Sequence, residues 1–393
     1  METALKLLTA IVARRLQQAL AATNPLCAEQ AGFRTKEECA AHIAALHEVC
    51  ERRSREGKQT VLAFIDFRQA FDRVPHGALL RKLEVRGVCR SGQTLAFIRA
   101  LYTNPYTIVT LPGGGRGERI NVERGVRQGC PLSPVLFNVF IDDILEGVEG
   151  VSVPRMRDNV RGFLFADDVA IPAESVECMC NALSVVEQWA EENHMECNAN
   201  KCGLMVVGGD MAVLREAKLE LSGGEIPVVE SYPYLGYPFN SNLDVKAAAA
   251  ARAEKGQTKL NMMTRFLTNK LIPLAPKLDA LRACLLPSLT YGGEMFGMNK
   301  SIVAKLESVW SKAVKMIVKG WGKPAAQVVQ YELGLFNIYQ TTSAQRARAF
   351  LKFPTLATII ADLCASPVAK SWFGKTRTWL RSELGAEYNA SQR

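Results

Sequence analysis

The chain has 393 residues, of which 48% are hydrophobic and 22% are charged, and its formal net charge is +9. This length suffices for two or three domains with cores of their own, and the composition is that of an ordinary soluble globular protein. No apolar run approaches the roughly 20 residues that cross a bilayer, so a membrane-spanning protein is excluded and we expect no membrane partner.

The positive charge is unevenly placed along the chain. Residues 252–282 and 300–393 carry a large excess of Lys and Arg, whereas residues 1–251 are net acidic. An acidic half joined to a basic half suits a protein that binds a polymer of phosphates, such as a nucleic acid. The basic residues could equally serve only to solubilise helices. The 11 cysteines are scattered without disulfide spacing. We therefore expect reduced thiols in an intracellular protein.

The N-terminal part is predicted to contain two helices and a buried strand. Residues 1–23 form an amphipathic pattern, and a second helix is expected between a capping box at Thr35 and a stop at Gly57. The apolar, β-branched run from residue 61 to residue 67 indicates a buried strand that carries Asp66 near its end. An isolated carboxylate in so apolar a run needs a partner.

A glycine-rich hairpin and a motif with candidate binding residues follow. Residues 76–104 are predicted to form two short helices, and residues 105–125 a hairpin. In the next stretch, GVRQGCPLSP, Gly129 allows close approach to the backbone and Gln128 offers a side-chain amide. These features suit contact with a nucleotide or a template strand, and a purely structural turn is the alternative.

The segment SPVLFNVFIDDIL has helical periodicity, with Ser133 as the expected N-cap and Pro134 in the first turn. It ends in the pair Asp142 and Asp143. Neighbouring residues on a helix point about 100° apart, so these two carboxylates diverge. We expect them to form a solvated helix end.

Residues 161–171 read RGFLFADDVAI, which is the pattern of a tight hairpin between two buried strands. Asp167 and Asp168 lie at its tip. Two neighbouring ionised carboxylates repel each other and are costly to bury, and a hard divalent cation such as Mg²⁺ is the usual remedy. The alternative is a solvated turn that happens to be acidic.

Asp66 and the Asp167–Asp168 hairpin are mutual candidates for one site if their strands lie side by side. Carboxylates from two strands can hold two metal ions roughly 3.5 to 4 Å apart, a spacing suited to in-line phosphoryl transfer. The sequence therefore predicts a metal site that handles phosphate.

The remainder is predicted to be mainly helical. A helix is expected at residues 174–194, followed by a strand with Lys201 at its entrance and a hairpin around Tyr234 and Gly236. Alanine-rich and leucine-rich helices continue from about residue 244 to the end. A lysine at the edge of a strand is usually only solvated.

Taken in order, the segments QAGFR, FIDFRQAFDRVPH, GVRQGCPLSP, FADD, NANK and YLG resemble the successive motifs of a reverse transcriptase. The residues in these motifs are most similar to those of reverse transcriptases from non-LTR (LINE-type) retrotransposons. The resemblance covers about residues 5–245 and is weaker beyond them.

The resemblance implies a right-hand polymerase fold of the α+β class. It divides the chain into partial fingers at 1–60, a palm at 61–245 with interleaved fingers at 73–125, a helical thumb at 246–330 and a helical extension at 331–393. The family also has a fingers segment upstream of what is here Met1, so we expect this chain to be a fragment, a degenerate copy or a domesticated one.

The resemblance also implies roles for individual residues. Two Mg²⁺ ions would be held by Asp66 and Asp167, with Asp168 completing the acidic cluster. Phe71 would exclude the 2′-hydroxyl of ribonucleotides, and Lys201 would protonate the leaving pyrophosphate. The contacts to the incoming nucleotide or the template fall on Arg34, Gln128 and Gly129, and the primer grip falls on Tyr234, Leu235 and Gly236.

The activity implied is extension of a DNA primer with dNTPs on an RNA template, in the nucleus, with ribonucleoprotein assembly in the cytoplasm. Two alternatives remain at this point. One is a catalytically inactive protein of the same fold that only binds nucleic acid, and the other is an RNA-dependent RNA polymerase, against which Phe71 argues. The sequence does not indicate the oligomeric state.

Overall fold

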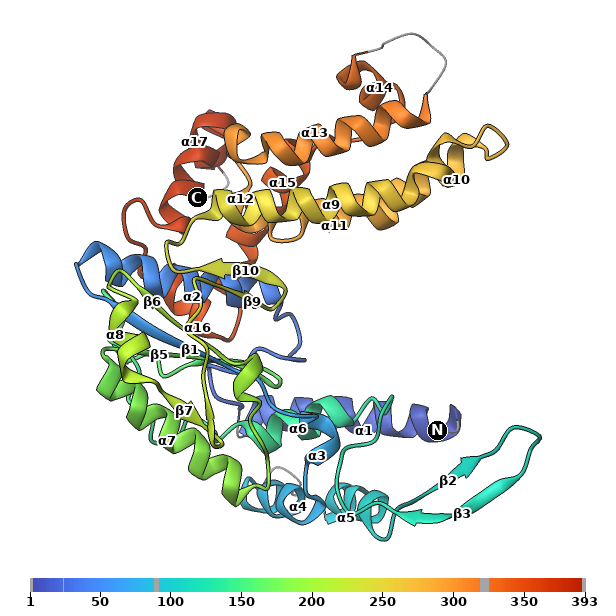
Figure 1. Ribbon diagram of the computed structural model, residues 1–393, viewed down its shortest axis with the longest axis vertical. Helices are drawn as coiled ribbons and strands as arrows, with labels where there is room; N and C mark the ends of the chain where they lie inside the picture. The colour runs from blue at the N-terminus through green and yellow to red at the C-terminus, as the bar shows by residue number, and fades with distance from the viewer. Residues whose placement is uncertain (1–2, 24, 88–91, 319–324, 391–393) are drawn as a thin grey trace. The chain divides into compact units, whose positions relative to one another are not determined.

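The computed structural model describes residues 3–23, 25–87, 92–318 and 325–390, and this part of the chain combines helices with antiparallel sheet (Figure 1). Its contacts divide the chain into two units. Unit 1 comprises Met1–Cys39 and Gly57–Val229, and unit 2 comprises Ala40–Glu56 and Glu230–Arg393. The predicted division into fingers, palm and thumb stays a prediction. Among the described helices, none combines the length and apolar character that crossing a membrane requires.

Unit 1 contains most of the strands. Its helices are α1 (Thr3–Thr23), α3 (Ala70–Arg73), α4 (His76–Val85), α5 (Gly92–Tyr102), α6 (Ser133–Ile141), α7 (Val176–Glu192), η1 (Ala199–Lys201) and α8 (Ala212–Ala217). Its strands are β1 (Thr60–Ile65), β2 (Tyr106–Thr110), β3 (Arg116–Asn121), β4 (Phe163–Phe165), β5 (Asp168–Ala173), β6 (Gly203–Val207), β7 (Glu220–Leu221) and β8 (Gly224–Glu225).

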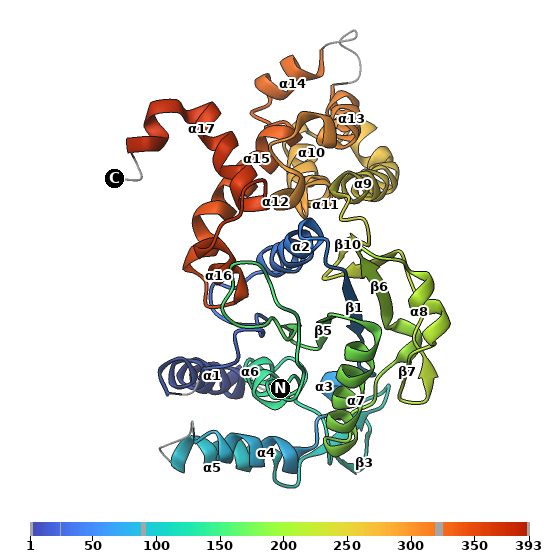
Figure 2. The same ribbon diagram turned by 90° about the vertical axis from the view of Figure 1, so that its left-hand side faces the viewer.

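A four-stranded antiparallel sheet of order β4-β5-β1-β6 forms the centre of unit 1. Every residue of β1 is buried, because this strand has a neighbour on each side and the sheet is covered by other elements. Helix α7 runs along the sheet and packs against β1 and β5 (Figure 2). This burial on both faces explains why β1 reads as a continuous apolar run rather than an alternating one.

The predicted elements of unit 1 are largely confirmed. The helix expected over residues 1–23 is present from Thr3, and the strand that leads to Asp66, the two short helices and the glycine-rich hairpin of β2 and β3 are also present. Residues 1–2 and 88–91 of the predicted helices lie outside the described residues. Two helix starts were predicted wrongly. Helix α2 begins at Cys39, which lies beyond the expected capping box at Thr35, and Ser133 is the first residue of α6 rather than its N-cap. The Ser133 hydroxyl instead donates to the carbonyl of Arg127.

Unit 2 is mainly helical. Its elements are nearly all of α2 (Cys39–Arg55), β9 (Ser231–Tyr234), β10 (Tyr237–Asn240), α9 (Val245–Thr268), α10 (Leu274–Ala280), η2 (Leu281–Leu285), α11 (Leu286–Thr290), α12 (Gly293–Phe296), α13 (Lys300–Ile317), α14 (Ala326–Glu332), α15 (Ile338–Lys352), η3 (Phe353–Thr355), α16 (Ile359–Ala365) and α17 (Trp372–Ala390).

The core of unit 2 forms between α9 and α13, whose apolar faces pack together around the fully buried Trp310. Both helices begin with a side-chain cap. Asp244 accepts from the backbone N–H of Lys246 at the start of α9, and Asn299 accepts from Ser301 and Ile302 at the start of α13. Such caps satisfy backbone donors that have no partner within the helix.

Candidate active site

The predicted carboxylates of unit 1 lie at one end of the central sheet. Strands β1 and β5 are antiparallel neighbours, as predicted, and their last pair is Ile65 with Val169. Asp66 directly follows Ile65, and Asp168 directly precedes Val169. Asp167 occupies the two-residue turn between β4 and β5. Residues a hundred positions apart in the chain are thereby brought to the same end of adjacent strands.

The electrostatics of these carboxylates favour a cation. Burial raises the pKa of Asp167, and the charge of Asp66 adds to this effect. The pKa of Asp168 is raised to about 6, first by burial of its carboxylate and then by the charges of Asp167 and Asp66. Other parts of the Asp168 residue are exposed to solvent. No basic residue is among the groups that shift these two pKa values. The charges that raise these pKa values are those of neighbouring carboxylates, so negative charge is concentrated at this end of the sheet.

This donor set fits a divalent metal ion. Magnesium is a hard cation that takes oxygen ligands, and proteins usually hold it through one or two carboxylates together with substrate phosphates. Among the described residues, no group of three or more His, Cys, Asp and Glu side chains is placed to hold a metal ion together. An ion held only by Asp66 and Asp167 would keep open positions for the oxygens of a phosphate.

The backbone at Asp66 is held by the segment that precedes β6. The N–H of Asp66 donates to the Sγ of Cys202 over 3.4 Å, and its carbonyl accepts from the N–H of Asn198 over 2.8 Å. Lys201 lies between these two residues, at the end of η1, and is exposed. The sequence singled out Lys201 but not Cys202, because a buried thiol in an apolar run carries no distinct signal.

The turn that carries Asp167 has an unusual backbone. Ala166 has a φ of 58°, a value that L-residues other than Gly, Asn and Asp rarely adopt. A non-glycine residue in this region costs on the order of 1–3 kcal/mol, and such strain persists only where the surrounding structure enforces it. Ala166 is buried, so its neighbours supply that constraint.

The predicted nucleotide-selecting residue Phe71 lies on α3 with its ring partly buried. Its ring stacks on that of Phe137 and meets the ring of Phe33 edge to face, with the latter centroids 6.2 Å apart. No pattern in the sequence indicated Phe33, which is 49% exposed and has a φ of 53°. The two neighbouring rings fix the position of Phe71.

The other predicted nucleotide or template contacts in unit 1 have different surroundings. Gln128 and Gly129 are exposed, and Gly129 has a φ of 69° with open space around its Cα. The Nε2 of Gln128 donates to the carboxylate of Asp72 over 3.5 Å, and the backbone at both positions is exposed to solvent. One guanidinium nitrogen of Arg34 donates to the carbonyls of Cys27 and Gln30. Part of this side chain therefore stabilises the loop that precedes Arg34.

The predicted primer grip belongs to unit 2. Tyr234 and Tyr237 pair at the end of the β9–β10 hairpin, and Leu235 and Gly236 form the turn with φ values of 47° and 73°. Two positive φ values are typical of a type I′ turn. The side chain of Tyr234 is buried, whereas Gly236 is exposed, so the turn rather than Tyr234 is accessible.

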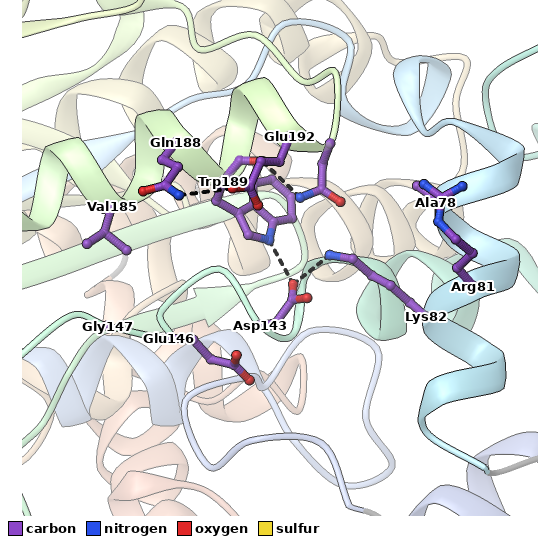
Figure 3. A pocket seen from close by; sticks show the side chains of 11 residues that line it. Ala78, Arg81, Lys82, Asp143, Glu146, Gly147, Val185, Gln188, Trp189 and Glu192 are labelled. Atoms are coloured by element: carbon purple, nitrogen blue, oxygen red, sulfur yellow. Dashed lines mark hydrogen bonds and ion pairs between the residues drawn. The ribbon is translucent and has the colours of Figure 1, made fainter.

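A pocket of about 540 Å³ in unit 1 contains none of the predicted site residues (Figure 3). The Nζ of Lys82 and the indole N–H of Trp189 both donate to the same oxygen of Asp143, each over 2.7 Å. Asp142 is buried and pairs with Arg86. The prediction that this acidic pair is a solvated helix end was therefore wrong, because Lys82 on α4 pairs with Asp143 and Arg86, directly after α4, pairs with Asp142.

Comparisons with known proteins give consistent results. A family model described as reverse transcriptase (RNA-dependent DNA polymerase) matches residues 1–239. A "Retrovirus-related Pol polyprotein from type-1 retrotransposable element R2" of Popillia japonica is 28% identical over 291 residues, which cover 70% of this chain and 45% of the relative. An "RNA-directed DNA polymerase from mobile element jockey" of Drosophila melanogaster is 24% identical, over 79% of this chain and 34% of the relative.

The chain thus spans less than half the length of these curated relatives. Among solved structures, apo telomerase from Candida tropicalis has a TM-score of 0.47 and 11% identity, over 96% of this chain and 61% of that chain.

Proposed function

Because the chain belongs to the reverse transcriptase family, whose model matches residues 1–239, we propose that it extends the 3′-hydroxyl of a DNA primer with dNTPs on an RNA template. The predicted resemblance to non-LTR retrotransposons is confirmed by relatives from R2 and jockey elements. The observation that carries the proposal is the meeting of Asp66, Asp167 and Asp168 at one end of the β4-β5-β1-β6 sheet.

In the proposed mechanism, Asp66 and Asp167 hold two Mg²⁺ ions and Asp168 adds negative charge beside them. Bound there, such ions lower the pKa of the attacking hydroxyl and neutralise charge on the leaving pyrophosphate. The raised pKa values of Asp167 and Asp168 support this assignment, because a bound cation would offset both the burial and the repulsion that raise them.

The remaining roles follow from placement around this cluster. Lys201 is exposed and lies within the segment from Asn198 to Cys202 that holds the backbone of Asp66. In this proposal it delivers a proton to the leaving group. Phe71 blocks a 2′-hydroxyl, and its fixed ring supports that role. Gln128, Gly129 and Arg34 contact the incoming nucleotide or the template, and the turn of Tyr234, Leu235 and Gly236 holds the primer end.

The proposed partners are an RNA template, a DNA primer and dNTPs. Base pairing supplies the sequence information, so the protein has to grip backbones, a task for which the excess of Lys and Arg in residues 252–393 is suited. We place the proposed reaction in the nucleus, because the relatives are named as retrotransposable and mobile elements. Cell fractionation of the tagged chain tests that location.

Primer extension on poly(rA)/oligo(dT) with dTTP and Mg²⁺ tests the activity. We expect extension by the full chain and a loss of at least about 100-fold in Asp167→Asn, because the variant keeps the size of the side chain but loses its charge. Asp158→Asn, at an exposed position of unit 1 outside the site, is the matched control. Binding of the template and primer without extension would instead support the non-catalytic alternative.

A further inference from the structure

The turn between β4 and β5 depends on a conformation that alanine does not favour. Ala166 occupies the first position of a two-residue loop with a φ of 58°, and the φ of Asp167 is not positive. This is the pattern of a type II′ turn, in which glycine is the usual first residue. A neighbouring group is therefore needed to hold Ala166 in place.

The side chain of Gln30 is that group. It is fully buried, and its Oε1 accepts from the backbone N–H of Ala166 over 3.0 Å and from that of Gly32 over 2.8 Å. The N–H of a turn residue has no strand partner, and buried backbone donors are almost always paired. Within the described residues the Nε2 of Gln30 makes no hydrogen bond, so Gln30 acts through its oxygen.

The backbone around Gln30 is fastened to the same hairpin. The N–H of Leu164 on β4 donates to the carbonyl of Glu29 over 2.9 Å, and the N–H of Ala31 donates to the carbonyl of Leu164 over 2.8 Å. A Cβ placed on Gly32 would lie 2.3 Å from the backbone nitrogen of Ala166. The segment from Glu29 to Gly32 therefore lies directly against the turn, and Gln30 cannot move without moving it.

We propose that Gln30 is a positioning residue for Asp167. Its hydrogen bond holds the peptide plane between Phe165 and Ala166, and this plane begins the turn from which the carboxylate of Asp167 projects. The inference rests on the proposed function for its effect on catalysis, but the hold on the turn exists without substrate or metal. Glu29, Gln30, Ala31 and Gly32 thus link the start of the chain to the acidic cluster.

Gln30→Met in the full chain tests the proposal, because methionine has a similar length and lacks the acceptor oxygen. We expect kcat for dTTP addition to fall roughly 10- to 100-fold, since small misplacements of reacting groups have effects of this size, while KM changes less than about threefold. Hydrogen exchange measured without Mg²⁺ should accelerate at the amides of Ala166 and Gly32, which donate to the Oε1 of Gln30. Ala166→Gly in the Gln30→Met background should raise kcat at least about threefold, because glycine adopts a positive φ unaided.

Gln330→Met is the matched control, because Gln330 is also buried but lies in unit 2 and donates to Glu307. A merely structural role predicts a lower Tm, faster exchange throughout unit 1 and no rescue by Ala166→Gly, and that result would overturn the proposal. Unchanged kcat in Gln30→Met would do the same. If the wild-type chain itself fails to extend a primer, the proposed function fails, and local exchange at Ala166 alone then decides whether Gln30 holds the turn.

Discussion

The ring of Phe71 stacks on the ring of Phe137, with centroids 4.2 Å apart and an interplanar angle of 16°. Phe137 is fully buried on α6, so it gives Phe71 a rigid support. A side chain that must exclude one hydroxyl group by its bulk needs such support, because a mobile ring would yield to the substrate.

Replacing Phe71 by valine should therefore weaken discrimination against ribonucleotides. We expect the ratio of kcat/KM for dTTP to that for UTP to fall about 10- to 100-fold, as is typical when steric exclusion of a small group is lost. Phe97→Val, at another partly buried aromatic of unit 1, is the control. A ratio within twofold of the wild-type value would remove Phe71 from nucleotide selection, and a preference for UTP in the wild type would favour an RNA polymerase.

Gly32→Ala should destabilise unit 1 for a steric reason. The added Cβ would overlap the backbone of Phe165 and Ala166, which cannot rotate away as a side chain can. We expect the free energy of unfolding to fall by about 1–3 kcal/mol, the usual cost of overpacking. Urea unfolding measures this, and Gly115→Ala, where the nearest atoms lie 3.8 Å away, should change little. Equal stability of the two variants would contradict the close approach.

Asp168 should make stability depend on pH in the absence of metal. Its folded-state pKa of about 6 lies above the ordinary aspartate value of 3.8, so its stabilising contribution is full below pH 3.8 and is lost as pH rises through 6. We expect Asp168→Asn to raise the Tm at pH 7 by more than at pH 5, and Mg²⁺ to reduce that advantage at pH 7. Thermal melts with EDTA and with Mg²⁺ measure it, and an advantage independent of pH would refute the assignment.

His42 should make the stability of unit 2 depend on pH in the opposite direction. Burial lowers its pKa from 6.5 to about 3, so the neutral form stabilises the fold above pH 6.5 and this contribution is lost as pH falls toward 3. Between pH 7 and pH 5 we expect a loss on the order of 2 kcal/mol, which His42→Leu should abolish. The exposed His194, replaced in the same way, is the control. Identical acid sensitivity in both variants would argue against burial of His42.

Local patterns in the sequence were sufficient to predict the acidic cluster. The apolar runs on either side of Asp167 and Asp168 determine a hairpin, and the apolar run ending in Asp66 determines the strand that pairs with it. Pairing in one sheet could be inferred because a buried carboxylate needs a partner. These predictions rest on periodicity and charge, which are visible within a short window.

Contacts between distant residues could not be predicted in the same way. Asp142 looked like a solvated helix end because Arg86, its partner, lies 56 positions earlier. The hydrogen bond from Ala166 to Gln30 spans 136 positions, and nothing in a buried glutamine identifies what it binds. The start of α2 was missed because Thr35 and Glu38 have capping-box spacing, whereas Lys36 between them has a φ of 74°, which a right-handed helix does not contain, and α2 begins at Cys39.

Helix α2 has a consequence for the order in which the protein can fold. It belongs to unit 2 although residues 57–229 of unit 1 follow it, and its buried charges are satisfied near the far end of the chain. Arg52 donates to the carbonyl of Leu363, 311 positions later, and Glu48 accepts from the backbone N–H of Trp372. During synthesis on the ribosome, α2 can meet Phe239 early through the ring of His47, but its contacts with Leu363 and Trp372 form only after these residues have emerged. Truncation before Leu363 should therefore remove two partners of its buried charges and destabilise unit 2.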